Sequence, residues 1–194
     1  MLCRPLTWRN ETLRTKSFMT APLFQPLTIR HVTFRNRFMS TSHACGLEEG
    51  GMPKERYQRY HEEKAKGGIG LTMFGGSSNI APDSSSVFQQ LYVGDDEVIP
   101  YLQQFSERVH KHGAAIMCQI THLGRRGEPY QGHWLLTIGP SAIRETLHRS
   151  FLKEMDDHDI ACVVRAFGAA ARRCKEGGCR LRRAAPLPCD VVDY

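Results

Sequence analysis

Hydrophobic and polar positions follow one another along this chain with a period that changes from segment to segment. Residues 27–30 and 32–35 alternate apolar and polar side chains around His31, which predicts a short two-stranded ribbon. Three later apolar runs end in glycine or polar residues and predict buried strands, at 37–40, 70–74 and 114–120. The pattern therefore predicts a ribbon followed by three strands.

Segments with a helical period lie between and after these strands. Pro53 suits the first turn of a helix, and the segment 54–66 runs from it to a pair of glycines. A second helix follows a cap at Asp95 or Asp96, with a stripe formed by Val98, Leu102, Phe105 and Val109. A third spans 157–176 and ends at Gly177. Its predicted cap is Asp156 or Asp157. Its predicted apolar face consists of Ile160, Val163, Val164, Phe167 and Ala171.

The resulting order is strand, helix, strand, helix, strand, helix, which is typical of a parallel sheet with right-handed crossovers. No G-x-G-x-x-G or Walker sequence follows a strand, and this disfavours a Rossmann or P-loop nucleotide site. Each predicted strand instead ends in small or polar residues. We therefore expect an α/β fold of the incomplete TIM (β/α)8 type, with roughly the first three βα units after an N-terminal ribbon.

Charge and cysteine content narrow the class of protein. The net charge is +6, but residues 1–18 contribute +3 and 179–194 contribute +1, so the intervening 160 residues hold only +2. A basic excess at the chain ends is poor support for a nucleic-acid surface. No apolar run reaches the ~18 residues of a membrane span. Seven irregularly spaced cysteines favour a reducing, cytoplasmic setting, with Cys118 and Cys162 as small core residues.

The candidate ligand-binding side chains lie at the end of the third predicted strand. Gln119, His122, Arg125 and Arg126 follow its apolar run, and in parallel α/β proteins the βα loops carry the ligand-binding side chains. An ordinary strand with a polar exit is the alternative explanation. Cys118 and His122 have no further ligand pair at usable spacing, so no metal site is predicted.

Other titratable pairs are predicted to be surface features. Glu62 and Glu63 lie on the first helix and are expected to form a solvated face. His110 and His112 are two positions apart at a helix end, where they do not share a face. We expect these four side chains to be exposed and without a catalytic role.

Three separated motifs resemble the Old Yellow Enzyme, or NADH:flavin oxidoreductase, family. They are the segment 36–43 (Asn-Arg-Phe-Met-Ser-Thr-Ser-His), the pair Gly75 and Gly76, and the segment 119–125 (Gln-Ile-Thr-His-Leu-Gly-Arg). They occur in order, each at a predicted strand end. Details around 42–51 and 121–126 look closer to the trimethylamine dehydrogenase and N-methylproline demethylase branch. The resemblance covers roughly residues 22–178, the N-terminal part of the family's barrel.

The resemblance implies an FMN-dependent oxidoreductase that acts on a small-molecule substrate of the amine or enone type. It places Thr41, Ser42 and His43 along the flavin and Gly75 where the isoalloxazine ring comes close. Gln119 is implied to meet the pyrimidine edge, which a carboxamide suits because it offers both a donor and an acceptor. The chemistry of hydride or electron transfer would belong to the cofactor.

The resemblance also places His122 and Arg125 near the flavin or in the loop above it. Ala44 stands directly after His43, where family members with covalently attached flavin carry a cysteine. Cys45 comes one position later, so we expect no covalent link. The iron–sulfur cysteines and second nucleotide domain of the demethylase branch are not expected in this chain, and its catalytic residues stay unknown.

The segment 179–194 differs from the family pattern. It contains three arginines and two prolines, which make a poor inner strand. We interpret it as an aberrant tail, produced by a change of reading frame after codon 178. Residues 1–20 are interpreted as a non-core extension, with Met19 as the expected initiator, and 21–178 as the barrel segment.

Three parallel strands would leave unpaired edges, so self-association is expected. FMN binding by this chain alone is expected to be weak or absent, because the phosphate site of such barrels is usually built by the loops after the seventh and eighth strands. Two alternatives to an oxidoreductase stay open. One is a catalytically inactive truncated product. The other is a small α/β interaction module whose exposed edges recruit a partner.

Overall fold

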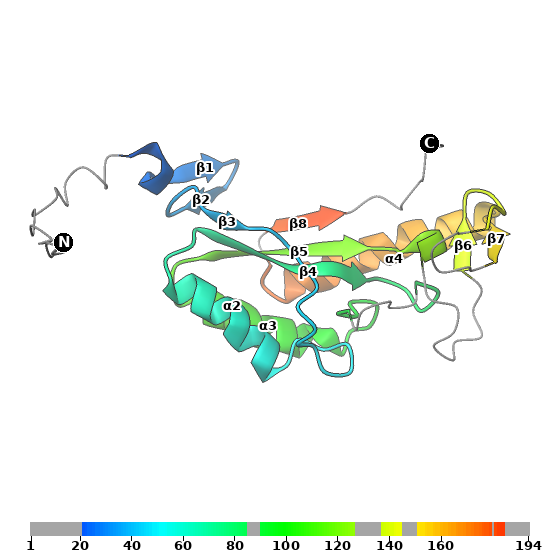
Figure 1. The fold of residues 1–194 in the computed structure, drawn as a ribbon, viewed down its shortest axis with the longest axis horizontal. Coiled ribbons are helices and arrows are strands. Elements are labelled where there is room, and N and C mark those ends of the chain that lie inside the picture. Colours follow the sequence, from blue (N-terminus) through cyan, green and yellow to red (C-terminus); the bar gives the residue numbers. More distant parts are fainter. Residues whose placement is uncertain (1–20, 85–89, 127–136, 145–150, 180, 185–194) are drawn as a thin grey trace, which may run out of the picture.

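A computed structural model describes residues 21–84, 90–126, 137–144, 151–179 and 181–184. Its centre is an all-parallel sheet in the order β3-β4-β5-β8 (Figure 1). The strands are β3 (Met39–Ser40), β4 (Leu71–Asn79), β5 (Ala115–Thr121) and β8 (Leu181–Ala184). Helices α2 (Glu55–Lys66), α3 (Val98–His110) and α4 (Asp157–Glu176) connect successive strands. The predicted α/β class with a parallel sheet is confirmed. The extension over 1–20 lies outside the described residues.

The three helices form where their apolar period predicts them. In α3 the whole predicted stripe is completely buried: Val98, Leu102, Phe105 and Val109. In α4 the Asp156 side chain accepts from the Asp159 amide while the Asp159 carboxylate accepts from the Asp156 amide, a reciprocal cap that satisfies two orphan donors. Burial of these stripes against the sheet, rather than helix propensity alone, stabilises the helices.

The apolar face of α4 is narrower than the sequence predicts. Ile160 is 48% exposed and Val164 is 65% exposed, whereas Val163, Ala170 and Cys174 are buried. The reason is geometric, because α4 contacts β5, β8 and α3 along one stripe and the two exposed residues lie beside it. Cys162 is also exposed on this helix, so the prediction that it is a core residue is wrong. Cys118 is fully buried as predicted.

The two faces of the sheet bury different clusters. Phe74, Ile116, Cys118 and Ile120 belong to the large cluster shared with the helices. Leu71 and Ala115 point to the opposite face, where they pack on the ribbon. This alternation is the period of two that strands impose on their side chains. The helices and the ribbon therefore cover opposite faces of the same strands.

The predicted ribbon is confirmed as the antiparallel pair β1 (Leu27–Ile29) and β2 (Val32–Phe34), which follows the short helix η1 (Pro22–Phe24). Val32 and Phe34 face the sheet and are buried. Just beyond β2, the guanidinium of Arg35 donates to the carbonyls of Ala65, Ile69 and His112 at 2.7–3.0 Å. One side chain thus fixes the ribbon to the end of α2 and the entrance of β5.

Two predictions about the edges of the sheet are wrong. The first strand was expected to be buried, but β3 is an edge strand in which Met39 is 49% exposed. The segment after residue 178 was expected to form no strand, but β8 pairs in parallel with β5 in the register Met117 to Leu181. The prolines that argued against a strand, Pro186 and Pro188, come after β8, and its four residues have every backbone donor.

A long excursion separates β5 from α4. It contains the short helix η2 (Gly124–Arg126) and the parallel pair β6 (Thr137–Gly139) and β7 (Leu152–Glu154). In Figure 1 this pair lies beyond the carboxyl end of β5. Within the described ranges, the helices are all too short or too polar to cross a membrane.

Candidate functional site at the strand ends

The carboxyl ends of β3, β4 and β5 come together at one edge of the sheet. The Ser42 hydroxyl, after β3, donates to Oε1 of Gln119 on β5. Between them lies the bulge of β4, where the backbone passes through Gly75 and Gly76 with positive φ angles of 106° and 54°. The strand does not end there as predicted, because β4 continues to Asn79. The three positions named by the sequence motifs therefore meet at one place.

The two glycines are required by this close approach. A Cβ atom at Gly75 would lie 2.7 Å from the Gln119 carbonyl oxygen and 2.4 Å from Ser78 Oγ. A Cβ at Gly76 would lie 2.2 Å from the His43 carbonyl carbon. These distances are shorter than any relaxed contact, and the positive φ angles also favour glycine. A bulge between Phe74 and Ser78 accompanies the turn.

The Gln119 carboxamide is oriented by its neighbour. Because Ser42 donates to Oε1, the amide nitrogen is directed away from Ser42 as a donor for another acceptor. Gln119 and Ser42 are both half-buried, which leaves this donor within reach of a ligand. The pair presents a neutral donor and acceptor at the sheet edge.

A second group of side chains lines the exit of β3. Thr41 and His43 are exposed. His43 Nε2 lies 3.4 Å from the hydroxyl of Tyr60, and the Lys64 ammonium lies 4.1 Å from the centroid of the same ring. Lys64 also donates to Ser40 Oγ at 3.0 Å. Helix α2 therefore contributes aromatic and cationic groups beside the predicted residues.

Tyr57 on α2 contacts the backbone at Gly75 and was not recognised in the sequence as part of the site. Its buried hydroxyl accepts a hydrogen bond of 3.0 Å from the Gly75 amide. Burial raises the pKa of the Tyr57 phenol well above its usual value, so the hydroxyl stays neutral. Its helical spacing with Gln58, His61 and Ala65 indicates only a core residue.

His122 and Arg125 lie just beyond β5. His122 is completely buried, with Nε2 3.2 Å from Asp83 Oδ1 and Nδ1 accepting from the Gly124 amide at 3.1 Å. Arg125 lies in η2, and a Cβ at Gly139 of β6 would be 3.8 Å from the Arg125 Cβ. The imidazole thus bonds within the protein and does not face the sheet edge. Asp83 lies between β4 and α3, in a segment for which the sequence predicts no helix or strand.

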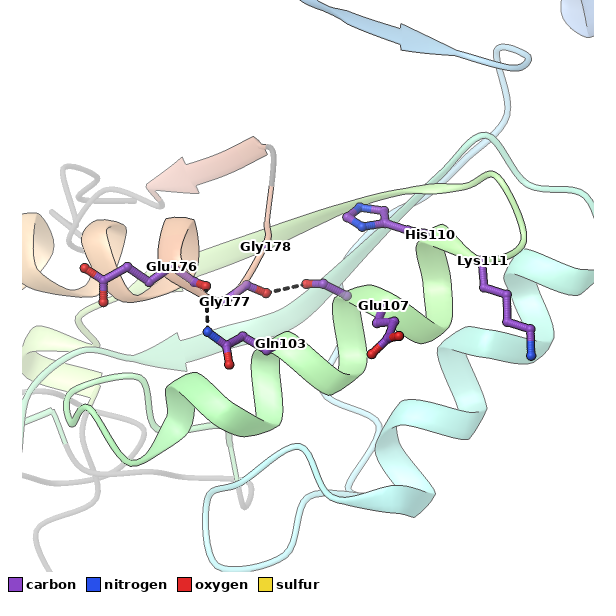
Figure 2. Close-up of a pocket in the computed structure, with 8 residues that line it drawn as sticks. Gln103, Glu107, His110, Lys111, Glu176, Gly177 and Gly178 are labelled. Atoms are coloured by element: carbon purple, nitrogen blue, oxygen red, sulfur yellow. Dashed lines mark hydrogen bonds between the residues drawn. The ribbon is translucent and has the colours of Figure 1, made fainter.

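A hollow of about 570 Å³ lies elsewhere, between the C-terminal ends of α3 and α4 (Figure 2). There Gln103 donates to the Glu176 carbonyl at 3.2 Å, and the Ser106 hydroxyl donates to the Gly177 carbonyl at 2.6 Å. Both bonds satisfy carbonyls at the end of α4. This hollow is near the amino ends of β5 and β8, whereas ligands of barrel folds lie at the carboxyl ends. We interpret this hollow as a gap where the ends of α3 and α4 pack together, and not as a ligand site.

The two glutamates predicted to form a solvated face, Glu62 and Glu63, differ in exposure. Glu63 is exposed, but the Glu62 side chain is only 14% exposed and lies 3.2 Å from His112 and 3.3 Å from Arg108. The hydrogen bond from His112 contributes most to lowering the pKa of Glu62. Glu62 therefore joins α2 to α3 and is no solvated residue. Across the described ranges, no three histidine, cysteine or acidic residues are grouped to hold a metal.

A parallel sheet with helices in its connections, and with glycines and polar side chains towards its carboxyl edge, defines the class of α/β proteins. Comparison with known proteins identifies the group. Residues 22–180 match the NADH:flavin oxidoreductase / NADH oxidase family. The chain belongs to this family, as the three motifs predict.

Individual relatives agree with this assignment. The chain is 58% identical over 157 residues to a "Multifunctional alkene reductase/demethylase OYE" from Caballeronia cordobensis, and 45% identical over 157 residues to a "Probable N-methylproline demethylase" from Rhizobium meliloti. Each alignment covers 81% of this chain and 23% of the relative, so the chain spans about a quarter of their length. The Old Yellow Enzyme from Pichia superposes with a TM-score of 0.79 at 18% identity, covering 86% of this chain and 46% of that one.

Proposed function

We propose that this chain forms the pyrimidine-side wall of an FMN site in a barrel oxidoreductase of this family. The observation that carries the proposal is the hydrogen bond from Ser42 to Gln119 across the glycine turn of β4. It joins the segment after β3 to β5 across the bulge of β4 and orients the carboxamide. In this reading the four parallel strands are the first half of the eight-stranded barrel.

The chemistry of the described residues fits a flavin. The free amide nitrogen of Gln119 can donate to a carbonyl oxygen of the pyrimidine ring, and the carboxamide oxygen retains a second lone pair for the imide N–H. Because residues 75 and 76 are glycines, β4 adds no side-chain bulk to this edge. Neither residue of the pair carries charge, which suits a neutral ring edge.

Bound FMN would supply hydride or electron transfer. The residues of this chain bind and orient its ring: Gln119 through the carboxamide, Ser42 by holding that carboxamide, and Thr41 and His43 along the β3 exit. Burial raises the pKa of the half-buried Cys45 thiol. A protonated thiol is a poor nucleophile, which supports a non-covalently held flavin.

The substrate class is proposed from the relatives alone. Their names describe alkene reduction and the demethylation of an N-methylated amino acid. We propose that the protein to which this wall contributes acts on a small alkene or N-methyl amine. A cytoplasmic location, as the cysteine pattern predicts, is part of the same proposal.

A chimera tests the proposal. Residues 22–180 of this chain replace the matching segment of the Caballeronia enzyme, and the purified protein is examined for bound flavin and alkene reduction. We expect a yellow, active protein, in which Gln119→Leu lowers flavin affinity about tenfold, as the loss of hydrogen bonds to a ligand predicts. An exposed control, Gln103→Leu on α3, should leave the affinity unchanged. A colourless but folded chimera would contradict the proposal.

The isolated chain is a different case. The phosphate site of (β/α)8 barrels is frequently built by the loops after the seventh and eighth strands, and the described sheet has four. We therefore expect the isolated 194-residue protein to bind FMN weakly or not at all. Flavin absorbance of the purified protein measures this, and a stoichiometric yellow complex would refute it.

A further inference from the structure

Two hydrogen-bond chains run side by side from the turn after β5 to the loop after β4. In the first, the Gly124 amide donates to His122 Nδ1 at 3.1 Å, and His122 Nε2 lies 3.2 Å from Asp83 Oδ1. These contacts join residues 39 positions apart in the sequence. The imidazole is the bridge between the two segments.

The second chain uses a hydroxyl as its bridge. The Leu123 amide donates to Ser84 Oγ at 2.7 Å, and the Ser84 hydroxyl lies 3.1 Å from Asn79 Oδ1. Consecutive amides at 123 and 124 therefore both end on side chains, and both chains lead to the loop that leaves β4.

The direction of each bond follows from the groups involved. A backbone amide can only donate, so Nδ1 of His122 is an acceptor and the ring proton resides on Nε2. That N–H donates to the Asp83 carboxylate, and this bond is the main cause of the lowered pKa of Asp83. In the same way Ser84 accepts from Leu123 and donates to Asn79. The donor and the acceptor of every hydrogen bond in both chains are therefore assigned.

The bridges are protected from water. His122 is 0% exposed, Ser84 2% and Asn79 3%. Breaking a bond here leaves a buried polar group without a partner, which destabilises a structure more than losing the same bond at the surface. The turn after β5 and the loop after β4 are therefore held as one unit.

We propose that Asp83 and His122 are positioning residues, which lock the turn η2, with Arg125, to the loop after β4 and so fix the end of β5 that carries Gln119. Because the imidazole is enclosed, His122 acts through the Gly124 backbone and not by touching a ligand. That the positioned edge faces a flavin rests on the proposed function. The locking of the two loops does not.

The test uses the full chain with three variants: Asp83→Ala removes the acceptor, Asp83→Asn keeps an oxygen acceptor, and Asp157→Ala removes an exposed carboxylate on α4. Amide hydrogen exchange and imidazole ¹⁵N spectra are recorded for each. In Asp83→Ala we expect the Leu123 and Gly124 amides to exchange about tenfold faster and the His122 Nε2–H signature to be lost. Asp83→Asn should restore both, and Asp157→Ala should change neither.

A merely structural role predicts another outcome, in which exchange accelerates evenly throughout the molecule. That result, or unchanged exchange at 123 and 124 in a folded Asp83→Ala protein, would overturn the proposal. FMN titration of the same proteins addresses the ligand. Wherever the wild-type chain shows measurable affinity, Asp83→Ala should weaken it about tenfold. If it shows none, exchange and nitrogen spectra still decide the positioning role, and the chimera decides the proposed function.

Discussion

Gly76 has the tighter environment of the two glycines in the β4 bulge. An added methyl group would overlap the backbone of His43, and φ is +54°. We expect Gly76→Ala to lower the free energy of unfolding by about 3 kcal/mol, measured by urea denaturation. Gly46→Ala is the matched control, because Gly46 has φ +65° but no atom within 4 Å of the added Cβ. It should lower stability by only about 1 kcal/mol, and equal losses would show that backbone strain alone matters.

His61 makes stability depend on pH. Its ring is 2% exposed among Tyr57, Phe74 and Phe105, with Nδ1 2.7 Å from Thr72 Oγ1. Burial, followed by Lys64 and His43, lowers the pKa of His61 to about 3. The unfolded chain therefore binds more protons than the folded one between pH 6.5 and 3. Stability is complete above pH 6.5 and falls as the pH drops through this window.

The expected loss from His61 is about 2 kcal/mol between pH 7 and pH 5. Urea denaturation at a series of pH values measures it. His61→Leu should flatten the curve over this range, whatever its effect on absolute stability. His31→Leu, at an exposed position in the ribbon turn, is the control for removing a histidine. An unaltered pH slope in His61→Leu would exclude His61 as the cause.

Individual side chains were harder to predict than elements. The motifs correctly brought Ser42, Gly75 and Gln119 together, because carboxyl ends of neighbouring parallel strands meet at one edge. They did not reveal that His122 turns inward, since its partner Asp83 is 39 positions away in the sequence. Tertiary partners decide which way a polar residue points, and spacing along the chain does not contain them.

At the scale of elements, the ribbon depends on Arg35. Its guanidinium donates hydrogen bonds to one carbonyl of α2 and to carbonyls just before β4 and β5. Arg35→Ala should lower the free energy of unfolding by about 2–4 kcal/mol, because it leaves partly buried carbonyls without donors. Lysine is expected to recover little, since it lacks the fork of donors. Arg37→Ala, at an exposed neighbouring position, should have an effect below about 0.5 kcal/mol.

The success of sequence reasoning differs between elements for a physical reason. The helices have a 3.6-residue period and their positions were predicted closely, although among the described helices only α4 has a side-chain cap and the N-cap position of α3 is Glu97 instead of the predicted Asp95 or Asp96. The strand β8 has no such local signal, because its pairing with β5 uses backbone groups that any non-proline residue offers. The reading-frame hypothesis for 179–194 is separate from this pairing, and the nucleotide sequence after codon 178 tests it.

At the scale of the whole molecule, the open edges of the sheet are the dominant feature. Within the described sheet, β3 and β8 each have a neighbour on one side only. Unpaired strand edges associate with other chains. We propose that this chain self-associates through them, and we expect a concentration-dependent rise in sedimentation coefficient.

Met39→Lys places a charge on the exposed edge strand β3 and should shift this equilibrium towards the monomer. Ile143→Lys is the control, because Ile143 is an exposed apolar residue outside the sheet. A wild-type chain that stays monomeric at every concentration would contradict the proposal. Equal effects of the two variants would point to general surface hydrophobicity.

The anchoring of Arg35 has a consequence for protein synthesis. Two of its carbonyl partners lie within the first 69 residues, but the third belongs to His112. A nascent chain that has emerged from the ribosome only as far as α3 cannot complete this set of bonds. The ribbon is made early, yet it can dock firmly only when the polypeptide has been translated past the start of β5.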